Sequence, residues 1–222
     1  MLKKHGFSSK HGETLETAVT SYKSVIDLAE SWCCLSSPNE SVVLLNYLID
    51  TLINDICIDQ VSLPIYKGFG NAVPHPFPTS CKDEYNKEIS CFTGRKISVE
   101  LSNTPVLTSP RDPTRTRSII IRLQKEKFEY NPLNHECYFY PEINLCYVGN
   151  GNHSINAGRY YKKGNVNASE ILLSKLFPHI ETDGVNWINT HLKAPIDGLK
   201  IPDFRFAVVY SLAQMRYNLT KG

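Results

Sequence analysis

The chain has 222 residues, of which 41% are hydrophobic and 21% are charged, and its formal net charge at pH 7 is +2. This length is sufficient for one large domain with a buried core, or for a core with a helical appendage. The composition excludes a chain that is disordered throughout, and the small net charge neither requires nor excludes a nucleic-acid partner.

The N-terminal quarter of the sequence predicts a helical hairpin that follows a short tail. Residues 1–12 are polar and basic, so we expect a flexible tail there. Apolar side chains recur at steps of four and three over residues 13–35, which is typical of an amphipathic helix. A second helix is expected at about residues 38–57, with Ser37 as its cap and Pro38 in its first turn. It is apolar on nearly all sides but is interrupted by Asn and Asp, which predicts a buried core helix and not a membrane span.

The middle of the sequence predicts strands that are separated by loops. Residues 61–80 hold four prolines and two glycines and predict a long loop, and residues 82–92 predict a short helix. Strands are predicted at 96–101, 118–123, 135–140 and 143–148.

Helical patterns return in the C-terminal part, at residues 154–162, 168–177 and 204–219. The order of helices, strands and helices indicates the α+β class, with a mixed β-sheet flanked by helices and an N-terminal helical hairpin. We expect the hairpin at 13–60 and the α+β domain at 61–222 to form one structural unit.

Seven cysteines are present, and no two of them form a CxxC pair. A structural zinc site would require paired ligands at short spacing, so no metal site is predicted. We expect the cysteines to be reduced and mostly buried, and the protein to be cytoplasmic.

A basic stretch occupies residues 111–127. Its cations are Arg111, Arg115, Arg117, Arg122, Lys125 and Lys127, and only Asp112 and Glu126 oppose them. The stretch is interpreted either as the solvated face of a strand or as a surface that faces phosphate groups.

A turn rich in glycine and asparagine, residues 149–154, lies within the segment LCYVGNGNHSINAGRYYKKG (145–164). It ends the last predicted strand and begins a helix, for which Ser154 is the expected N-cap. Glycine allows the backbone to approach a phosphate, and free N–H groups at a helix N-terminus attract the anion. A purely structural role for the turn also stays open, because Asn and Gly tolerate positive φ and His can bond to the backbone.

Through Gly151, His153 and Ala157, this turn resembles the Gly-x-His-Arg turn of the ParB/sulfiredoxin-like superfamily. The string GNHSI-x-AG is also similar to one in uncharacterised bacterial families, some of them near mobile elements. The arginine position of the superfamily is occupied by Ser154, so its guanidinium clamp is absent. Arg115, Arg117 or Arg159 would have to balance the phosphate charge instead.

The resemblance implies a nucleotide- or phosphoester-handling protein, such as a nucleotide hydrolase or a nuclease. Its ligand would be a nucleotide, with or without Mg²⁺, or the phosphate of a nucleic acid. The candidate catalytic residues are His153, His135 and Glu136. The candidate phosphate-binding residues are Gly149, Gly151, Asn152, Ser154, Arg115, Arg117 and Arg159. Asn152 and His153 are expected to be partly exposed, so truncating either should cost about 1 kcal/mol of stability or less.

An alternative of another class also remains. The chain would be a non-enzymatic interaction module of a phage–host conflict or mobile-element system, with the ParB-like turn serving only as scaffold. The apolar hairpin would then bind a second copy or a partner protein. Neither interpretation predicts a membrane partner.

Overall fold

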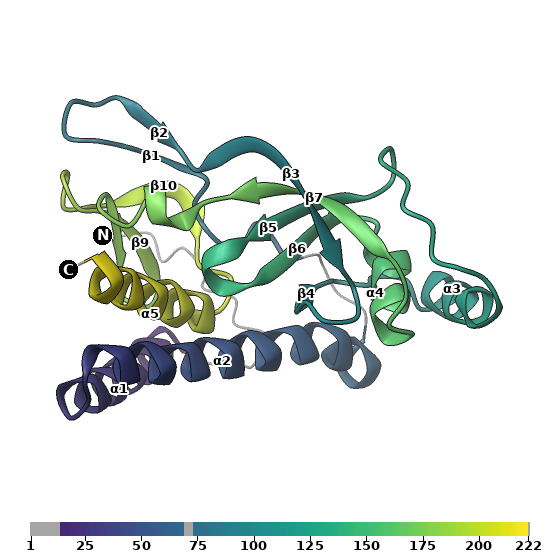
Figure 1. Cartoon of the computed structure of the whole chain (residues 1–222), viewed down its shortest axis with the longest axis horizontal. Coiled ribbons are helices and arrows are strands. Elements are labelled where there is room, and N and C mark those ends of the chain that lie inside the picture. Colours follow the sequence, from purple (N-terminus) through teal and green to yellow (C-terminus); the bar gives the residue numbers. More distant parts are fainter. Residues whose placement is uncertain (1–13, 69–72, 222) are drawn as a thin grey trace. The chain divides into compact units, whose positions relative to one another are not determined.

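The computed structural model describes residues 14–68 and 73–221, so the predicted tail at 1–12 lies outside the described residues. The described residues form five α-helices, two short 3-10 helices and three β-sheets (Figure 1). The predicted α+β class, with two helices before a sheet-rich region, is confirmed. The chain divides into two compact units. Unit 1 contains the residues up to Leu52, Pro76–Cys91 and the residues from Ser174 onward, and unit 2 contains Ile53–His75 and Phe92–Leu173.

The N-terminal helical hairpin is confirmed. Helix α1 (Leu15–Cys34) is capped by Thr14, whose hydroxyl accepts the N–H of Thr17. Helix α2 (Pro38–Lys67) begins with a capping box, in which the Ser37 N–H and hydroxyl both donate to the Glu40 carboxylate.

Helix α2 is ten residues longer than expected, so the loop predicted from residue 61 begins too early. It continues because Gln60 and Leu63 are still buried, and it contains Pro64 in its last turn. Among the described residues, α2 alone is long and apolar enough to cross a membrane by length and composition. The core helix of a soluble protein can pass the same test, so this finding is weak evidence for a membrane span.

Unit 1 also contains two small sheets and the last helix. Strands β1 (Ser80–Lys82) and β2 (Glu88–Ser90) form a hairpin, so the short helix predicted at 82–92 is wrong. Its turn is set by Asp83, whose carboxylate accepts two backbone N–H groups, and by Asn86 at φ 61°. The second sheet has the order β10-β9-β8 and is antiparallel. These elements and the last helix have the bounds β8 (Ile180–Thr182), β9 (Asn186–Asn189), β10 (Ala194–Lys200) and α5 (Phe204–Lys221).

Unit 2 is built on a mixed five-stranded sheet with the order β3-β7-β5-β6-β4. The strands are β3 (Phe92–Glu100), β4 (Val106–Leu107), β5 (Glu136–Tyr140), β6 (Leu145–Asn150) and β7 (Asn165–Ile171). A short 3-10 helix (Pro141–Ile143) joins β5 to β6. Pairing is antiparallel for β3–β7 and β5–β6 and parallel for β7–β5 and β6–β4.

The helix predicted at 168–177 is wrong, because its first half belongs to β7 and Leu173–Lys175 form a 3-10 turn. Val166, Ala168 and Glu170 alternate as buried residues along β7, which pairs with a strand on each side. The burial of one sheet face and the pairing on both edges favour the strand over the helical pattern of the sequence.

The strand predicted at 118–123 is also wrong, because these residues belong to helix α3 (Pro113–Lys125). The side chain of Asp112 accepts the Arg115 N–H, and Pro113 occupies the first turn, where its missing N–H costs nothing. The three consecutive isoleucines favour a strand locally, but in the helix Leu123 is buried while Arg115, Arg117 and Arg122 are exposed.

Helix α4 (Asn152–Tyr160) follows β6 and is inserted into the core of unit 2 through Ile155. Helices α3 and α4 pack against each other at one end of the five-stranded sheet (Figure 1). None of the seven cysteines, all of which lie in the described residues, forms a disulfide, and five of them are buried. Burial raises the pKa of the Cys57 thiol to about 12, so this thiol is inert at neutral pH.

Candidate functional site

The turn after β6 requires glycine at position 151. Gly151 has φ +89° and is the N-cap of α4. A Cβ there would lie 2.5 Å from His135 Cδ2 and 2.9 Å from the Asn134 carbonyl oxygen. The predicted N-cap, Ser154, is wrong, because α4 begins at Asn152 and the Ser154 hydroxyl donates to the Gly151 carbonyl at 3.0 Å.

The N-terminus of α4 has no side-chain cap. Ile155 is the first residue of the helix whose N–H has a helical partner, the Gly151 carbonyl at 3.0 Å. The N–H groups of Asn152, His153 and Ser154 therefore have no acceptor within the helix, which is the arrangement that favours an anion.

Asn152 is a structural residue of the turn. It is buried, and its Oδ1 accepts the backbone N–H of Ser109 at 2.6 Å. One helical turn later, the buried Asn156 accepts the hydroxyl of Thr108 at 3.3 Å. The expectation that Asn152 is partly exposed is wrong, because its amide fixes α4 to the segment after β4.

His135 is held in one tautomer by its neighbours. Its Nδ1 accepts the backbone N–H of Asn131 at 3.0 Å, so the ring proton lies on Nε2. Nε2 then donates to the Ser154 hydroxyl at 2.9 Å, and that hydroxyl donates its own proton to the Gly151 carbonyl. His135 is buried, and this burial lowers its pKa. It is therefore a neutral donor that orders the turn.

His153 is held in the opposite tautomer. The hydroxyl of Thr116 donates to the Asp112 carbonyl at 2.7 Å, so it can only accept from His153 Nδ1, at 3.0 Å. The lone pair of the neutral ring therefore lies on Nε2, which has no hydrogen-bond partner among the described residues.

The charges around His153 favour its neutral form. Partial burial lowers its pKa most, Arg115 and Arg111 lower it further, and Asp112 opposes them. His153 is therefore a neutral acceptor at physiological pH, placed beside two guanidinium groups.

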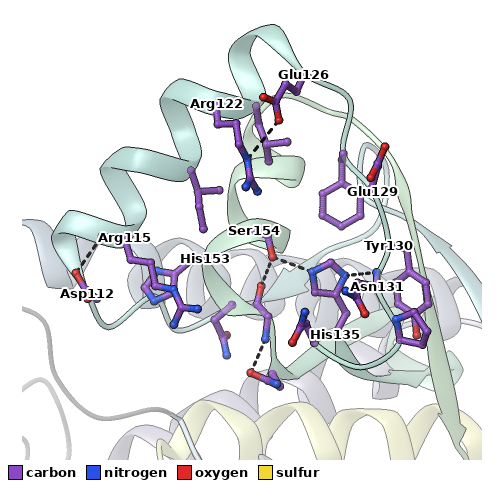
Figure 2. A pocket seen from close by; sticks show the side chains of 18 of the residues that line it. Asp112, Arg115, Arg122, Glu126, Glu129, Tyr130, Asn131, His135, His153 and Ser154 are labelled. Atoms are coloured by element: carbon purple, nitrogen blue, oxygen red, sulfur yellow. Dashed lines mark hydrogen bonds and ion pairs between the residues drawn. The ribbon is translucent and has the colours of Figure 1, made fainter.

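These side chains line an open pocket of about 1410 Å³ in unit 2. Figure 2 shows Asp112, Arg115 and His153 together at one end, and Glu129, Tyr130 and Asn131 at the other. One wall is formed by α3, and the other by residues 128–135 with the turn 150–154. This volume is larger than a phosphate group requires.

The structure brings together only part of the predicted site. Of the predicted residues, the pocket is lined by Gly151, Asn152, His153, Ser154, His135 and Arg115. The predicted residues Gly149, Glu136, Arg117 and Arg159 do not line it.

The excluded residues have other surroundings. Glu136 is paired with Asn150 in the sheet, but its carboxylate accepts the Tyr138 hydroxyl at 2.5 Å. The Tyr138 pKa is raised to about 12 by burial and by this carboxylate. Arg159 lies in the last turn of α4, seven residues beyond the N–H groups that begin the helix.

Sequence reasoning missed several residues that line the pocket. Arg111, Arg122 and Lys127 were recognised only as members of a basic stretch, and the contact of Thr116 with His153 was not foreseen. The missed signal is the pair Asp112-Pro113, an N-cap followed by a first-turn proline. Reading it as a helix start places 115, 119 and 122 on one face of the helix and Arg111 just before its N-cap.

Residues 14–68 and 73–221 contain no group of three or more His, Cys, Asp or Glu side chains that could hold a metal ion. At its His153 end, the pocket offers amide N–H groups, guanidinium groups and one imidazole lone pair beside the Asp112 carboxylate. This set suits an anion with a nearby proton acceptor.

Comparison with known proteins gives a family for this chain. No curated protein and no solved structure is significantly similar to it. A family model described as "Family of unknown function (DUF6710)" matches residues 4–221, nearly the whole sequence. The chain therefore belongs to the DUF6710 family.

Proposed function

We propose that this chain is a cytoplasmic nucleotide- or phosphoester-handling protein, which binds a phosphate group at the turn 150–154. The observation that carries the proposal is His153, whose Nε2 lone pair is unpaired in a pocket beside Arg115 and Arg111. The resemblance of the turn to the ParB/sulfiredoxin-like superfamily supports the same assignment.

The roles of the two histidines follow from their tautomers. His153 is the general base, since its Nε2 can accept a proton from a water or hydroxyl that attacks the phosphorus. As the new P–O bond forms, the P–O bond to the leaving group breaks, and that group departs with the electron pair of the bond. His135 does not serve as the base for the Ser154 hydroxyl, because its Nε2 carries the proton that Ser154 accepts. His135 is therefore a positioning residue.

The phosphate is balanced by groups from both walls of the pocket. Arg115 and Arg111 replace the arginine that the superfamily has at the position of Ser154, and the N–H groups of the first turn of α4 add to them. A magnesium ion, if the ligand brings one, would be held mainly by phosphate oxygens.

Calorimetric titration of the whole chain with ATP, CTP and GTP, with and without magnesium, tests the proposal. We expect at least one nucleotide to bind, and Arg115→Ala to weaken it about tenfold or more, since a charge-assisted hydrogen bond contributes about 1.5–3 kcal/mol. Arg117→Ala is the matched control, because Arg117 lies on the same helix but does not line the pocket. The absence of binding by all three nucleotides, or equal effects of the two variants, would contradict the proposal.

A second candidate function is favoured by the exposed apolar side chains of the hairpin. Leu35 is 86% exposed, and Val43, Tyr47 and Ile58 on α2 are more than half exposed. Val43 and Tyr47 are one helical turn apart, which suits contact with another helix. In this alternative the chain is a non-enzymatic module that binds a second copy or a partner protein through α2.

Size-exclusion chromatography with light scattering distinguishes the two candidates. A dimer that Tyr47→Glu converts to a monomer would support the interaction module. A strict monomer that binds nucleotide would count against it.

A further inference from the structure

The two ends of the pocket differ in net charge. At the His153 end, Arg111 and Arg115 face one anion, Asp112, and the neutral histidine. The Asp112 carboxylate is engaged by the Arg115 backbone N–H at 3.0 Å. This end therefore has an excess of positive charge.

At the other end the charges cancel. Arg122 and Lys127 are balanced by Glu126 and Glu129, and Arg122 forms an ion pair with Glu126 at 3.4 Å. Arg122 lies seven residues beyond Arg115 on α3, which separates the two side chains by about 10 Å along the helix axis. A carboxylate at this end repels a phosphate, so a second phosphate has no evident place here.

The neutral end carries groups that suit a nucleoside. Phe128 and Tyr130 present aromatic rings, which are fixed against His135 with centroid distances of 5.4 Å and 5.6 Å. The carboxylate of Glu129 and the side-chain amide of Asn134 have no hydrogen-bond partner among the described residues. Rings of this kind stack on bases, and a carboxylate accepts hydrogen bonds from ribose hydroxyls or base amino groups.

We propose that the pocket binds a nucleoside phosphate in one direction, with its phosphate at His153 and its nucleoside at Glu129. Glu129 is then a specificity-determining residue. This inference rests on the proposed function, and it adds the class and the orientation of the ligand.

The test is calorimetric titration of the whole chain with pyrophosphate and with ATP, CTP and GTP. Wild type, Glu129→Gln and Glu88→Gln are compared. Glu129→Gln keeps the shape of the side chain and removes its charge, and Glu129 is exposed, so folding should be preserved. Glu88 is an exposed glutamate on β2 in unit 1 and serves as the matched control.

We expect the preferred nucleotide to bind at least about tenfold more tightly than pyrophosphate, which corresponds to about 1.4 kcal/mol. Glu129→Gln should weaken that nucleotide about tenfold and leave pyrophosphate unchanged, and Glu88→Gln should alter neither.

Three other results would overturn the inference in distinguishable ways. If Glu129→Gln tightens both ligands, the phosphate lies beside Glu129 and the direction is reversed. If pyrophosphate binds as tightly as the nucleotides and Glu129→Gln changes neither, the pocket recognises phosphate alone, and the proposed function stands without the orientation. If neither pyrophosphate nor any nucleotide binds to the wild type, the proposed function itself fails.

Discussion

The surroundings of His135 and those of His153 use their polar groups in different ways. Around His135, both ring nitrogens and the hydroxyl of Ser154 are bonded within the protein. Around His153, the exposed Arg115 and Arg111 line the pocket, and the histidine keeps a lone pair unused. The polar side chains around His135 therefore have their hydrogen bonds satisfied by the protein, whereas those around His153 are available to a ligand. Substitutions around His135 should change stability first, and those of His153 and its arginines should change binding first.

Gly151→Val should give the largest effect, on stability. Position 151 combines φ +89° with the short contacts to His135 and Asn134, so backbone strain and overpacking add to about 3 kcal/mol or more. Thermal melting measures the loss. Gly94→Val is the matched control, because Gly94 also has positive φ but no atom lies within 4 Å of the place that its Cβ would occupy. Equal losses in the two variants would show that the contacts with His135 do not matter.

His153→Ala and Asn152→Ala should distinguish a proton-accepting role at position 153 from a structural role at the adjacent position 152. In His153→Ala, the loss of the proton acceptor should reduce turnover on the order of a hundredfold and change the free energy of unfolding by less than about 1 kcal/mol. Asn152→Ala should instead destabilise by about 1–3 kcal/mol, because the buried Ser109 N–H loses its acceptor. Thermal melting and turnover of both variants check this. If His153→Ala lowers the melting temperature as much as Leu145→Ala in the core of β6, His153 is structural.

Thr116→Val should have a smaller effect, on the tautomer of His153. Valine keeps the shape but removes the acceptor of the Nδ1–H, so the ring can exchange its proton between the two nitrogens. We expect a loss of about fivefold in nucleotide affinity or turnover, equivalent to about 1 kcal/mol. Nitrogen-15 NMR of the imidazole should show Nδ1–H in wild type and a mixture in the variant. An unchanged spectrum would contradict the tautomer assigned here.

The smallest expected effect is the dependence of stability on pH. The pKa values of His135 and His153 are both lowered in the folded protein from the ordinary value of 6.5. The unfolded chain therefore binds more protons just below pH 6.5, and the stabilisation that is present above this pH is lost as the pH falls. Melting temperatures between pH 7.5 and 5.5 should decline, and the decline should be weaker in His135→Gln. A melting temperature that rises on acidification would oppose the assignment.

Much of the fold was predictable because its signals are local. The amphipathic pattern of α1, the capping serine of α2 and the apolar runs of β5 and β6 are each signalled within a few residues. Strand β7 was not predictable in this way, because its burial depends on β3 and β5, which are distant in sequence.

The site, like the fold, combines features that local sequence signals predict with features that depend on distant contacts. The turn at 149–154 was predicted from sequence because Gly-rich turns are recognisable, and His135, a candidate residue from the strand predicted at 135–140, bonds to Ser154 of this turn. The arginine wall was missed because it exists only if residues 113–125 are helical, and three isoleucines suggested otherwise. Asn152 was predicted to bind phosphate because its local sequence does not reveal that it is buried. Its partner, the Ser109 N–H, lies forty-three residues earlier in the chain.

Unit 1 combines segments that are far apart in the sequence, and this has a consequence for its folding during synthesis on the ribosome. Helix α1 packs on α5, and Tyr22 bonds to Ser211 at 2.9 Å across 189 residues of sequence. The apolar face of α1 therefore remains uncovered until Phe204–Lys221 have been translated, whereas the continuous segment Phe92–Leu173 can form its sheet earlier. A nascent chain stalled before Phe204 would expose α1 without its native partner, which makes α1 a candidate contact for chaperones during translation.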